Sequence, residues 1–309
     1  MTQQPIPSAL FCGVLLFFGV AARLSAQELQ PRAYIPTPVG MNFFSASYSN
    51  NSGGLLFDPA LPVEDGNVKA NIYALTFGQT LAVLGRTTQA LAVIPYVEAN
   101  LDGHFAGDQT HLYRSGVGDM VFRYAMNIHG APAMSREKFA AYRQKTIVGA
   151  SITVAAPTGQ YDPVRLINIG ANRWAFKPEI GVSRAITKWT VEGAAGIWLF
   201  TTNNKFQYNG ASTRSQIPLG SMQLHLVRLL PRRMWLAGDA TFFTGGRSQV
   251  NGNDRNDYIA NQRFGATFGI ALNHRQAIKV SFFDGVLTRI GADIRSIGVS
   301  YTVIWQKGS

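Results

Sequence analysis

Charged and apolar side chains alternate between residues 173 and 180. The charged positions are Arg173, Lys177 and Glu179, and the apolar positions are Trp174, Phe176 and Ile180. Alternate side chains of an extended strand point to opposite faces, so the three charges share one face. If the apolar face meets lipid, the charges must point inward, because an Arg or Lys at the bilayer midplane costs about 2–4 kcal/mol. Two interpretations stay open: the charges select a solute, or they form an ion-pair ladder that braces the wall.

A second polar group has the same arrangement. Asp119, Arg123 and Asn127 share one face of the segment 116–129, where each lies four residues from the next, and Glu98 repeats the pattern one segment earlier. Asp119 and Arg123 either join a charge network with the first group or form an internal salt bridge without a solute. The candidates for lining a polar interior are Arg173, Lys177, Glu179, Asp119, Arg123, Asn127, Glu98, Arg165, Asn168 and Asn172.

Residues with the spacing of a catalytic or metal site are scarce. His104 and His111 share a stretch with Asp102 and Asp108, but a separation of seven positions in an irregular loop is a weak spacing for metal ligands. Neither a Gly-x-Ser-x-Gly nor a His-Glu-x-x-His pattern occurs. We therefore expect no enzyme activity, no cofactor and no metal site.

The N-terminus is typical of an export signal. The apolar run from Ala9 to Ala22 is shorter than the roughly 20 residues of a membrane-spanning helix, and Leu24-Ser25-Ala26 suits a cleavage site. We predict a signal peptide over residues 1–26, although no Lys or Arg precedes the apolar run. The one cysteine, Cys12, is removed with it, so the mature chain cannot form a disulfide bond.

Period-two alternation of apolar and polar residues dominates the remaining chain. It predicts twelve strands, over residues 39–49, 68–84, 88–101, 116–129, 146–156, 172–185, 188–200, 216–230, 233–244, 263–273, 276–286 and 293–305. Most exceed the five or six residues of an ordinary strand and reach the 9–11 that a tilted membrane-spanning strand needs. A spanning sheet must close on itself, because unpaired backbone groups cannot face lipid. The predicted fold is an all-β transmembrane antiparallel β-barrel of about twelve strands.

The connections alternate in length, as in outer-membrane barrels with short periplasmic turns and longer external loops. Short turns are expected near Gly85, Thr187, Arg232 and His274. The connection 130–145 is an exception, and Ser135-Arg136-Glu137 predicts a short periplasmic helix there. Aromatic rings near strand ends suit the two membrane interfaces, and the candidates are Tyr48, Trp189, Trp235 and Trp305.

Four ordered motifs resemble a known bacterial family. They are Glu28–Asn42, Phe57-Asp58-Pro59-Ala60-Leu61-Pro62 with Glu64-Asp65, Gly116-Val117-Gly118-Asp119, and a block from Pro157-Thr158-Gly159-Gln160-Tyr161-Asp162-Pro163 to Gly181. Together they look like the putative MetA-pathway phenol-degradation proteins, over roughly residues 28–305. The resemblance implies an outer-membrane barrel associated with the breakdown of aromatic or hydrophobic compounds, without a catalytic residue to carry over.

The expected organisation is a signal peptide (1–26), a periplasmic segment (27–38) and a barrel (39–309). The expected function is passive uptake of small hydrophobic or aromatic compounds across the bacterial outer membrane. The alternative is a structural or adhesion barrel with a plugged, non-conducting lumen. Expected partners are the solute, outer-membrane lipid including lipopolysaccharide, and the barrel-assembly machinery during insertion. The +11 charge does not indicate nucleic-acid binding, because the basic residues are scattered.

Overall fold

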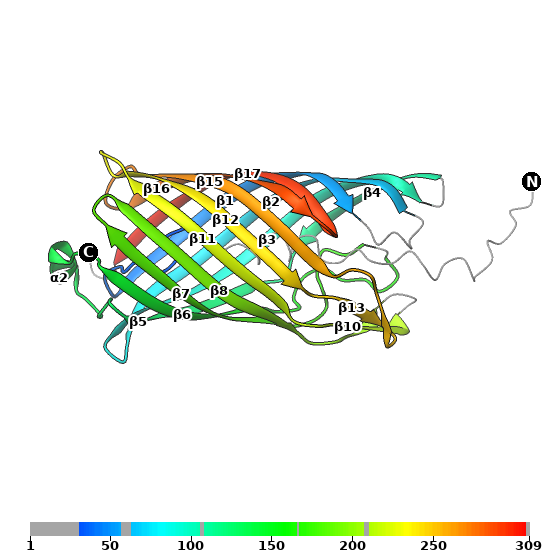
Figure 1. The fold of residues 1–309 in the computed structure, drawn as a ribbon, viewed down its shortest axis with the longest axis horizontal. Helices are drawn as coiled ribbons and strands as arrows, with labels where there is room; N and C mark the ends of the chain where they lie inside the picture. Colours follow the sequence, from blue (N-terminus) through cyan, green and yellow to red (C-terminus); the bar gives the residue numbers. More distant parts are fainter. Residues whose placement is uncertain (1–30, 57–62, 106–107, 166, 207–209, 307–309) are drawn as a thin grey trace, which may run out of the picture.

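The computed structural model describes residues 31–56, 63–105, 108–165, 167–206 and 210–306. The predicted signal peptide and the motif at 57–62 lie outside the described residues. Twelve strands form the barrel (Figure 1): β1 (Met41–Leu56), β2 (Val63–Val83), β3 (Arg86–Phe105), β5 (Val121–His129), β6 (Thr146–Ala155), β7 (Ala175–Ile186), β8 (Trp189–Phe200), β11 (Leu219–Leu229), β12 (Met234–Gly245), β15 (Ile259–Ala271), β16 (Gln276–Thr288) and β17 (Gly291–Gln306).

The barrel closes between its first and last strands. β1 pairs antiparallel with β17 along its whole length, from Met41 opposite Gln306 to Leu56 opposite Gly291. Each remaining barrel strand pairs with the barrel strands before and after it in the chain, so the twelve strands form a closed ring. The predicted closed twelve-stranded barrel is confirmed.

The outer surface carries an apolar belt. Exposed aliphatic side chains such as Leu75, Ile180, Leu224, Val280 and Val299 alternate with buried inward residues along the strands. Such a belt is the surface that a barrel presents to hydrocarbon chains. No helix in the described part of the chain is long and apolar enough to span a membrane.

Aromatic rings mark the edges of this belt, with one correction to the predicted set. Tyr48 lies 5.3 Å, centroid to centroid, from Tyr73 on the outward face, and the outward Trp305 lies 6.3 Å from Phe77. Trp235 does not belong to the girdle. It lies on the inward side of β12, where a Cβ on Gly269 would overlap its ring.

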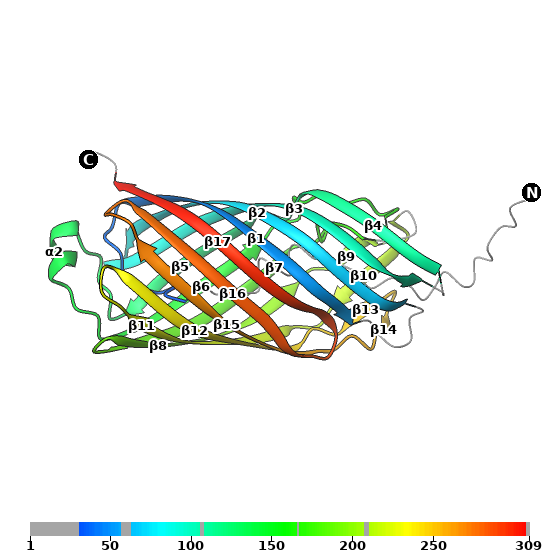
Figure 2. The ribbon, with the colours of Figure 1, turned by 90° about the horizontal axis from the view of Figure 1, so that it is seen from above.

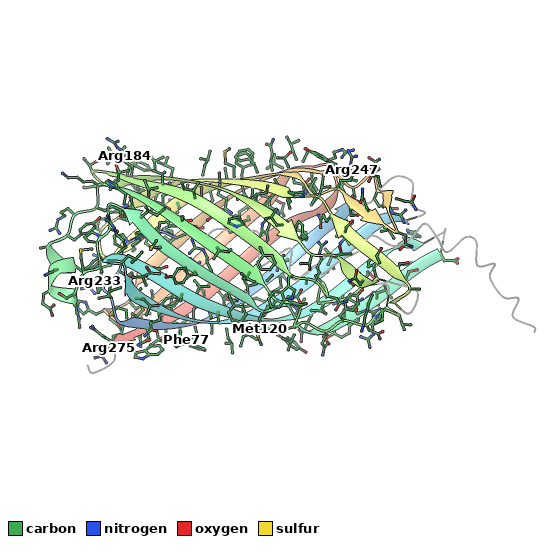
Figure 3. All side chains as sticks on the ribbon, turned by 90° about the horizontal axis from the view of Figure 1, so that it is seen from below. Phe77, Met120, Arg184, Arg233, Arg247 and Arg275 are labelled. Carbon is green, nitrogen blue, oxygen red and sulfur yellow. The ribbon has the colours of Figure 1, made fainter. Side chains whose placement is uncertain are left out.

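The two ends of the barrel differ. Short turns join strands at one end, such as Leu84–Gly85, where both residues adopt positive φ as a tight hairpin requires. The predicted helix in the connection 130–145 is α2 (Arg136–Ala141), capped by the Ser135 hydroxyl. By analogy with other outer-membrane barrels this end is periplasmic. Arg184, Arg233 and Arg275 gather there, whereas Arg247 lies at the opposite end (Figure 3).

The opposite, extracellular end is built from extensions of the barrel wall. A small second sheet consists of β9 (Asn203–Phe206), β10 (Ser212–Gln216), β13 (Ser248–Val250) and β14 (Asn253–Asp254). β4 (Asp108–Val117) projects at the same end and pairs with the outer half of β3 (Figure 2). The predicted continuous strand over 116–129 is therefore wrong: the chain forms β4 and β5, separated by residues 118–120.

Candidate functional site: the wall break and the closed lumen

The break between β4 and β5 interrupts the barrel wall. β3 pairs with β4 in its outer half and with β5 in its inner half. β6 pairs with β5 only as far as Ala155 and then leaves the sheet. Among the described strands, β4 therefore has a neighbour on one edge only. Gly116 permits the bend with a φ of +152°, and a Cβ there would overlap the Gln160 side chain.

The chain between β6 and β7, residues 156–174, folds beside this break; we name it the inner loop. Its backbone bonds directly to the broken wall, since Gln160 N–H donates to Val117 O and Ala156 N–H donates to Met120 O, both at 2.9 Å. Within the loop, Gly170 N–H donates to Gln160 O at 2.9 Å. The inner loop thus occupies the place where the wall lacks a strand.

Asp119 fastens the inner loop. Its carboxylate accepts from Gly159 N–H at 2.9 Å and from Ala171 N–H at 2.8 Å, and the residue is 1% exposed. A Cβ at position 159 would lie 2.7 Å from Asp119 N, so only glycine allows this approach. Burial raises the pKa of Asp119, while the two backbone hydrogen bonds and the charge of Arg173 oppose that rise. A single carboxylate therefore joins both arms of the loop to the break.

Two isoleucines of the inner loop pack against the inner face of the barrel wall. Ile167 and Ile169 are buried in one apolar cluster with inward residues of β1, β2, β3 and β17, which include Ile72 and Val97. The cluster lies on the inner face of four adjacent strands of the barrel wall. The inner loop therefore covers the break in the wall and packs against the inner face of these strands.

A cavity of ≈ 310 Å³ lies between β4 and the inner loop. Its lining is Arg114, Ser115, Gln160, Tyr161, Asp162, Arg165, Ile167, Asn168 and Ile169. Arg114 donates from Nε to Ile167 O at 3.0 Å, and Arg165 Nε lies 3.2 Å from Asp162 Oδ2. We name it the outer cavity; the apolar cluster closes its inner side through Ile167 and Ile169.

Farther in, a buried ion pair lies on β7. Lys177 Nζ is 2.7 Å from Glu179 Oε2, and both side chains are less than 5% exposed. Glu179 also accepts a hydrogen bond from the Tyr34 hydroxyl at 2.9 Å. Tyr34 belongs to the chain that precedes β1, so the ion pair binds a residue brought into the lumen from the N-terminus.

Residues 31–38 form an N-terminal plug inside the barrel. Asn127 Nδ2 donates to Tyr34 O at 3.2 Å, the Arg123 guanidinium lies 5.2 Å from the centre of the Tyr34 ring, and Arg32 N–H donates to Glu192 Oε2 at 2.5 Å. The segment expected as periplasmic over 27–38 thus enters the lumen within its described part. Burial and the charge of Glu179 raise the pKa of Tyr34 to about 12.

Two glycines make room for the plug. A Cβ on Gly149 of β6 or on Gly181 of β7 would overlap the Tyr34 ring. Glycine in a strand commonly marks a close approach of another group, and here the group is a tyrosine from the same chain. The Tyr34 ring of the N-terminal plug therefore packs into a recess of the barrel wall that these two glycines leave; we name this recess the seat of Tyr34.

The structure places nine of the ten predicted site residues at the inner loop or around the N-terminal plug. Asp119, Arg165, Asn168 and Asn172 lie at the inner loop, as does Arg173, whose guanidinium donates to Gln216 Oε1 and lies 4.4 Å from the Phe200 ring centre. Lys177, Glu179, Arg123 and Asn127 lie around the N-terminal plug. Of the two arrangements expected for Asp119 and Arg123, the described residues show no salt bridge between them: Asp119 accepts hydrogen bonds from the inner loop, and Arg123 lies over the Tyr34 ring. The charge of Arg173, from the first group, acts on Asp119.

The prediction that Glu98 lines the polar interior is wrong. Its neighbours Val97 and Ala99 are buried inside the barrel, whereas Tyr96 is 41% exposed on the outer face, and Glu98 shares that outer face. Tyr96 lies 6.5 Å from Tyr73 in the outer aromatic girdle. Glu98 therefore lies just beyond the apolar belt, where a charge meets polar head groups or water rather than hydrocarbon.

A buried polar triad in the lumen was missed from the sequence. His225 Nδ1 lies 2.6 Å from Asp239 Oδ1, and Thr267 Oγ1 donates to Asp239 Oδ2 at 2.6 Å. The residues come from β11, β12 and β15, so no local spacing joins them. In the sequence, these polar residues alternate with apolar ones such as Leu224 and Leu236, which are exposed on the outer face. This alternation is the signal that could have placed each of them in the lumen.

A second cavity, of ≈ 200 Å³, lies in the lumen beside the N-terminal plug. Pro31 reaches it from the plug, and Ile72 of the apolar cluster lines its outer side. The rest of the lining comes from β1, β2, β3, β15, β16 and β17. We name it the lumenal cavity; like the outer cavity, it is lined in part by the apolar cluster.

The closed barrel, its apolar outer belt and its polar interior define an integral β-barrel protein of the bacterial outer membrane. Residues 45–286 match the family described as putative MetA-pathway of phenol degradation, so the chain belongs to that family. The resemblance inferred from the sequence motifs is confirmed. No curated protein matches the chain.

Solved structures share the fold at low sequence identity. An outer membrane channel from Pseudomonas putida F1 superposes with a TM-score of 0.77 at 18% identity, covering 90% of this chain and 100% of the channel. The transport unit of the Escherichia coli autotransporter AIDA-I gives 0.54 at 5% identity, with coverage of 93% and 96%. The β domain of the Bordetella autotransporter BrkA gives 0.50 at 14% identity, with coverage of 86% and 100%.

Proposed function

We propose that the protein is a passive outer-membrane channel for small aromatic or hydrophobic compounds, seen here in a closed state. The observation that carries the proposal is the pair of cavities inside the barrel, of ≈ 310 and ≈ 200 Å³, which are both lined in part by one apolar cluster. A cavity of about 150 Å³ lined by apolar side chains holds a benzene molecule. Each cavity therefore has room for a single aromatic ring with a small substituent.

The closing elements support a channel rather than a solid barrel. The strands alone do not fill the lumen; the inner loop and the N-terminal plug enter it from opposite ends. Neither is part of a barrel strand, so each could withdraw without breaking one. The family description, which refers to phenol degradation, supports an aromatic solute.

The route follows from the order of these parts. A solute would enter the outer cavity between β4 and the inner loop and pass Ile167 and Ile169 once the loop moves. It would then reach the lumenal cavity and leave past Tyr34 when the N-terminal plug is released. Asp119 would hold the first barrier and Glu179 the second. Diffusion down a gradient requires no energy source and no cofactor.

Residues on the outer surface of the barrel are consistent with lipid, lipopolysaccharide and the barrel-assembly machinery as partners. The tyrosine girdle at Tyr48, Tyr73 and Tyr96 suits the head-group region of the outer leaflet, and the exposed Arg247 at the same end suits lipopolysaccharide phosphates. Insertion of a closed barrel with this outer belt would need the barrel-assembly machinery, and export would need cleavage of residues 1–26.

The alternative is a structural barrel that never opens. The close packing of the Tyr34 ring against Gly149 and Gly181 is the specific observation that favours a barrel that never opens. Purified mature protein in planar bilayers distinguishes the two. A channel gives discrete conductance steps, together with uptake of phenol or benzyl alcohol into proteoliposomes. Electrical silence with no uptake above protein-free liposomes contradicts the channel.

A further inference from the structure

The periplasmic end of the barrel carries an excess of positive charge. In the connections β5–β6, β7–β8, β11–β12 and β15–β16, all within the described residues, Glu137 is the only acidic residue, against eight exposed basic ones. We name these eight the basic rim: Arg136, Lys138, Arg143, Lys145, Lys188, Arg232, Arg233 and Arg275. Figure 3 shows Arg233 and Arg275 at this end together with Arg184. The excess of positive charge therefore lies on the periplasmic side of the membrane.

The opposite end of the barrel has no such excess. Basic side chains there lie beside acidic ones, since Arg247 is 3.5 Å from Asp254 Oδ2 and Arg295 is 3.2 Å from Asp284 Oδ2. No residue of the basic rim forms an ion pair of this kind in the described part of the chain. The charges of the rim are thus available to an anionic partner outside the chain.

Two more arginines lie beside the rim, on the lipid-facing wall. Arg184 of β7 and Arg228 of β11 follow the exposed Val182 and Leu226 in the outward alternation of their strands. The Arg228 guanidinium lies 4.7 Å from the ring centre of Trp189, which is 39% exposed on β8. An indole ring together with basic side chains is typical of the boundary between lipid and water.

The strand register gathers these residues on one patch of the outer wall. Trp189 lies opposite Arg228 in the pairing of β8 with β11, and Arg184 lies opposite Val191, two positions along β8 from Trp189. Lys188 precedes Trp189 in the tight turn between β7 and β8. Three cations thus surround one exposed ring. We name this the head-group patch: Arg184, Lys188, Trp189 and Arg228.

The chemistry of the head-group patch fits a phospholipid. Guanidinium groups hold phosphate oxygens through paired hydrogen bonds, and an ammonium adds a point charge. The exposed Val182, Val191 and Leu226 continue from the patch toward the middle of the membrane, where the acyl chains lie. The patch contains no acidic side chain, so nothing in it would pair with the cationic part of a zwitterionic head group. An anionic head group is therefore favoured.

The distribution of the charges favours a membrane over an acidic protein. The basic rim occupies four connections that follow one another around the barrel from β5 to β16, and two further cations lie on the wall itself. Lipid surrounds a barrel on every side, whereas a protein partner would cover one part of it. Basic side chains close to an anionic membrane surface each add to the attraction.

We propose that the head-group patch binds an anionic phospholipid of the periplasmic leaflet. Arg184, Lys188 and Arg228 hold its phosphate, and its acyl chains lie along the adjacent apolar wall. The basic rim attracts the same class of lipid around the rest of the barrel. The proposal requires the membrane location of the barrel and does not depend on whether the lumen conducts.

Native mass spectrometry of the mature protein in a non-ionic detergent tests the patch. The protein is titrated with phosphatidylglycerol and, for comparison, with the zwitterionic phosphatidylcholine. We expect the pair Arg184→Gln with Arg228→Gln to weaken binding of phosphatidylglycerol about twenty- to thirtyfold, because each basic residue near anionic lipid contributes about a fivefold gain in binding. The pair Arg184→Lys with Arg228→Lys keeps both charges and should retain most of the binding.

A matched control removes the same charge from the opposite end. The pair Arg247→Gln with Arg295→Gln also replaces two exposed arginines, and phosphatidylglycerol should bind it as it binds wild type. Heat-modifiable gel mobility shows that each variant has formed its barrel.

The outcomes separate an anionic lipid from other ligands. Preference for phosphatidylglycerol that is lost in the glutamine pair at the patch, and kept in the lysine pair and the control, supports the proposal. Equal binding of the two lipids, or an equal loss in the control, overturns it. Displacement of the lipid by excess glycerol phosphate would instead indicate a site for soluble phosphate. Tighter binding of a polyglutamate peptide than of the lipid would indicate an acidic protein partner, and either result also overturns the proposal.

Discussion

Replacing Asp119 with alanine should release the inner loop. The carboxylate accepts from Gly159 N–H and Ala171 N–H at 2.9 and 2.8 Å, and these two residues lie on opposite arms of the loop. Alanine offers no acceptor, so both N–H groups lose their partner. The bonds from Gln160 N–H to Val117 O and from Ala156 N–H to Met120 O remain, so the barrel keeps its form while the loop opens more often.

The size of the effect follows from the two lost bonds. A hydrogen bond to a charged group contributes about 1.5–3 kcal/mol, so the pair contributes about 3–6 kcal/mol. Part of this is offset, because the variant no longer buries a carboxylate; the raised pKa of Asp119 shows that burial disfavours its charge. A net loss of roughly 2–4 kcal/mol raises the opening equilibrium constant about thirty- to several-hundredfold.

Hydrogen exchange and conductance measure this change. The amides of Gly159 and Ala171 should exchange faster by the same factor, and single-channel records should show more frequent opening. Asp119→Asn keeps one acceptor and should fall between wild type and alanine. Asp284→Ala is the control, because its carboxylate makes only an exposed pair with Arg295, worth about 0–1 kcal/mol. Wild-type exchange rates at both amides in Asp119→Ala would refute the role of Asp119 as the fastening of the loop.

Three further predictions concern the N-terminal plug and its seat. The pKa of Tyr34 is about 12 in the plug against 10.0 for free tyrosine, so its contribution to plug binding is fully present below about pH 10 and is lost as the pH rises to 12. Conductance of wild type should rise over this range, and conductance of Tyr34→Phe should not follow this titration. Gly181→Val should expel the Tyr34 ring and expose the plug to proteases, whereas Gly238→Val, where a Cβ meets nothing within 4 Å, should not. Lys177→Met leaves Glu179 buried without its cation and should lower the free energy of unfolding by about 3–5 kcal/mol in urea titrations, a loss that adding Glu179→Gln should largely reverse.

The strand pattern was predictable because lipid imposes it locally. Each residue between Ile297 and Trp305 either faces hydrocarbon or does not, and the alternation can be read without knowing any partner strand. The same reasoning placed Lys177 and Glu179 on the inner face and Trp174 on the outer face. It failed for Glu98, because the cost of an outward charge applies at the membrane midplane and not beyond the tyrosine girdle.

The prediction that Trp235 lies at the membrane interface failed for a different reason. An aromatic ring near a strand end is typical of the membrane interface, but here the lumen offers an equally good environment, with the Arg32 guanidinium 5.4 Å from the ring centre. Arg32 comes from the N-terminal plug, some 200 residues earlier in the sequence. A residue's neighbourhood inside a barrel depends on what enters the lumen, and alternation carries no information on that.

The sequence by itself determined that this protein is a twelve-stranded membrane barrel with a polar interior. The thickness of the bilayer sets the length of the strands, and its apolarity sets the period-two alternation. Only the tertiary structure showed which segments enter the lumen, the inner loop and the N-terminal plug. Asp119 meets residues 40 and 52 positions away, and Tyr34 meets Glu179 across 145 positions. Such contacts arise from barrel closure, which brings together strands that no local spacing relates.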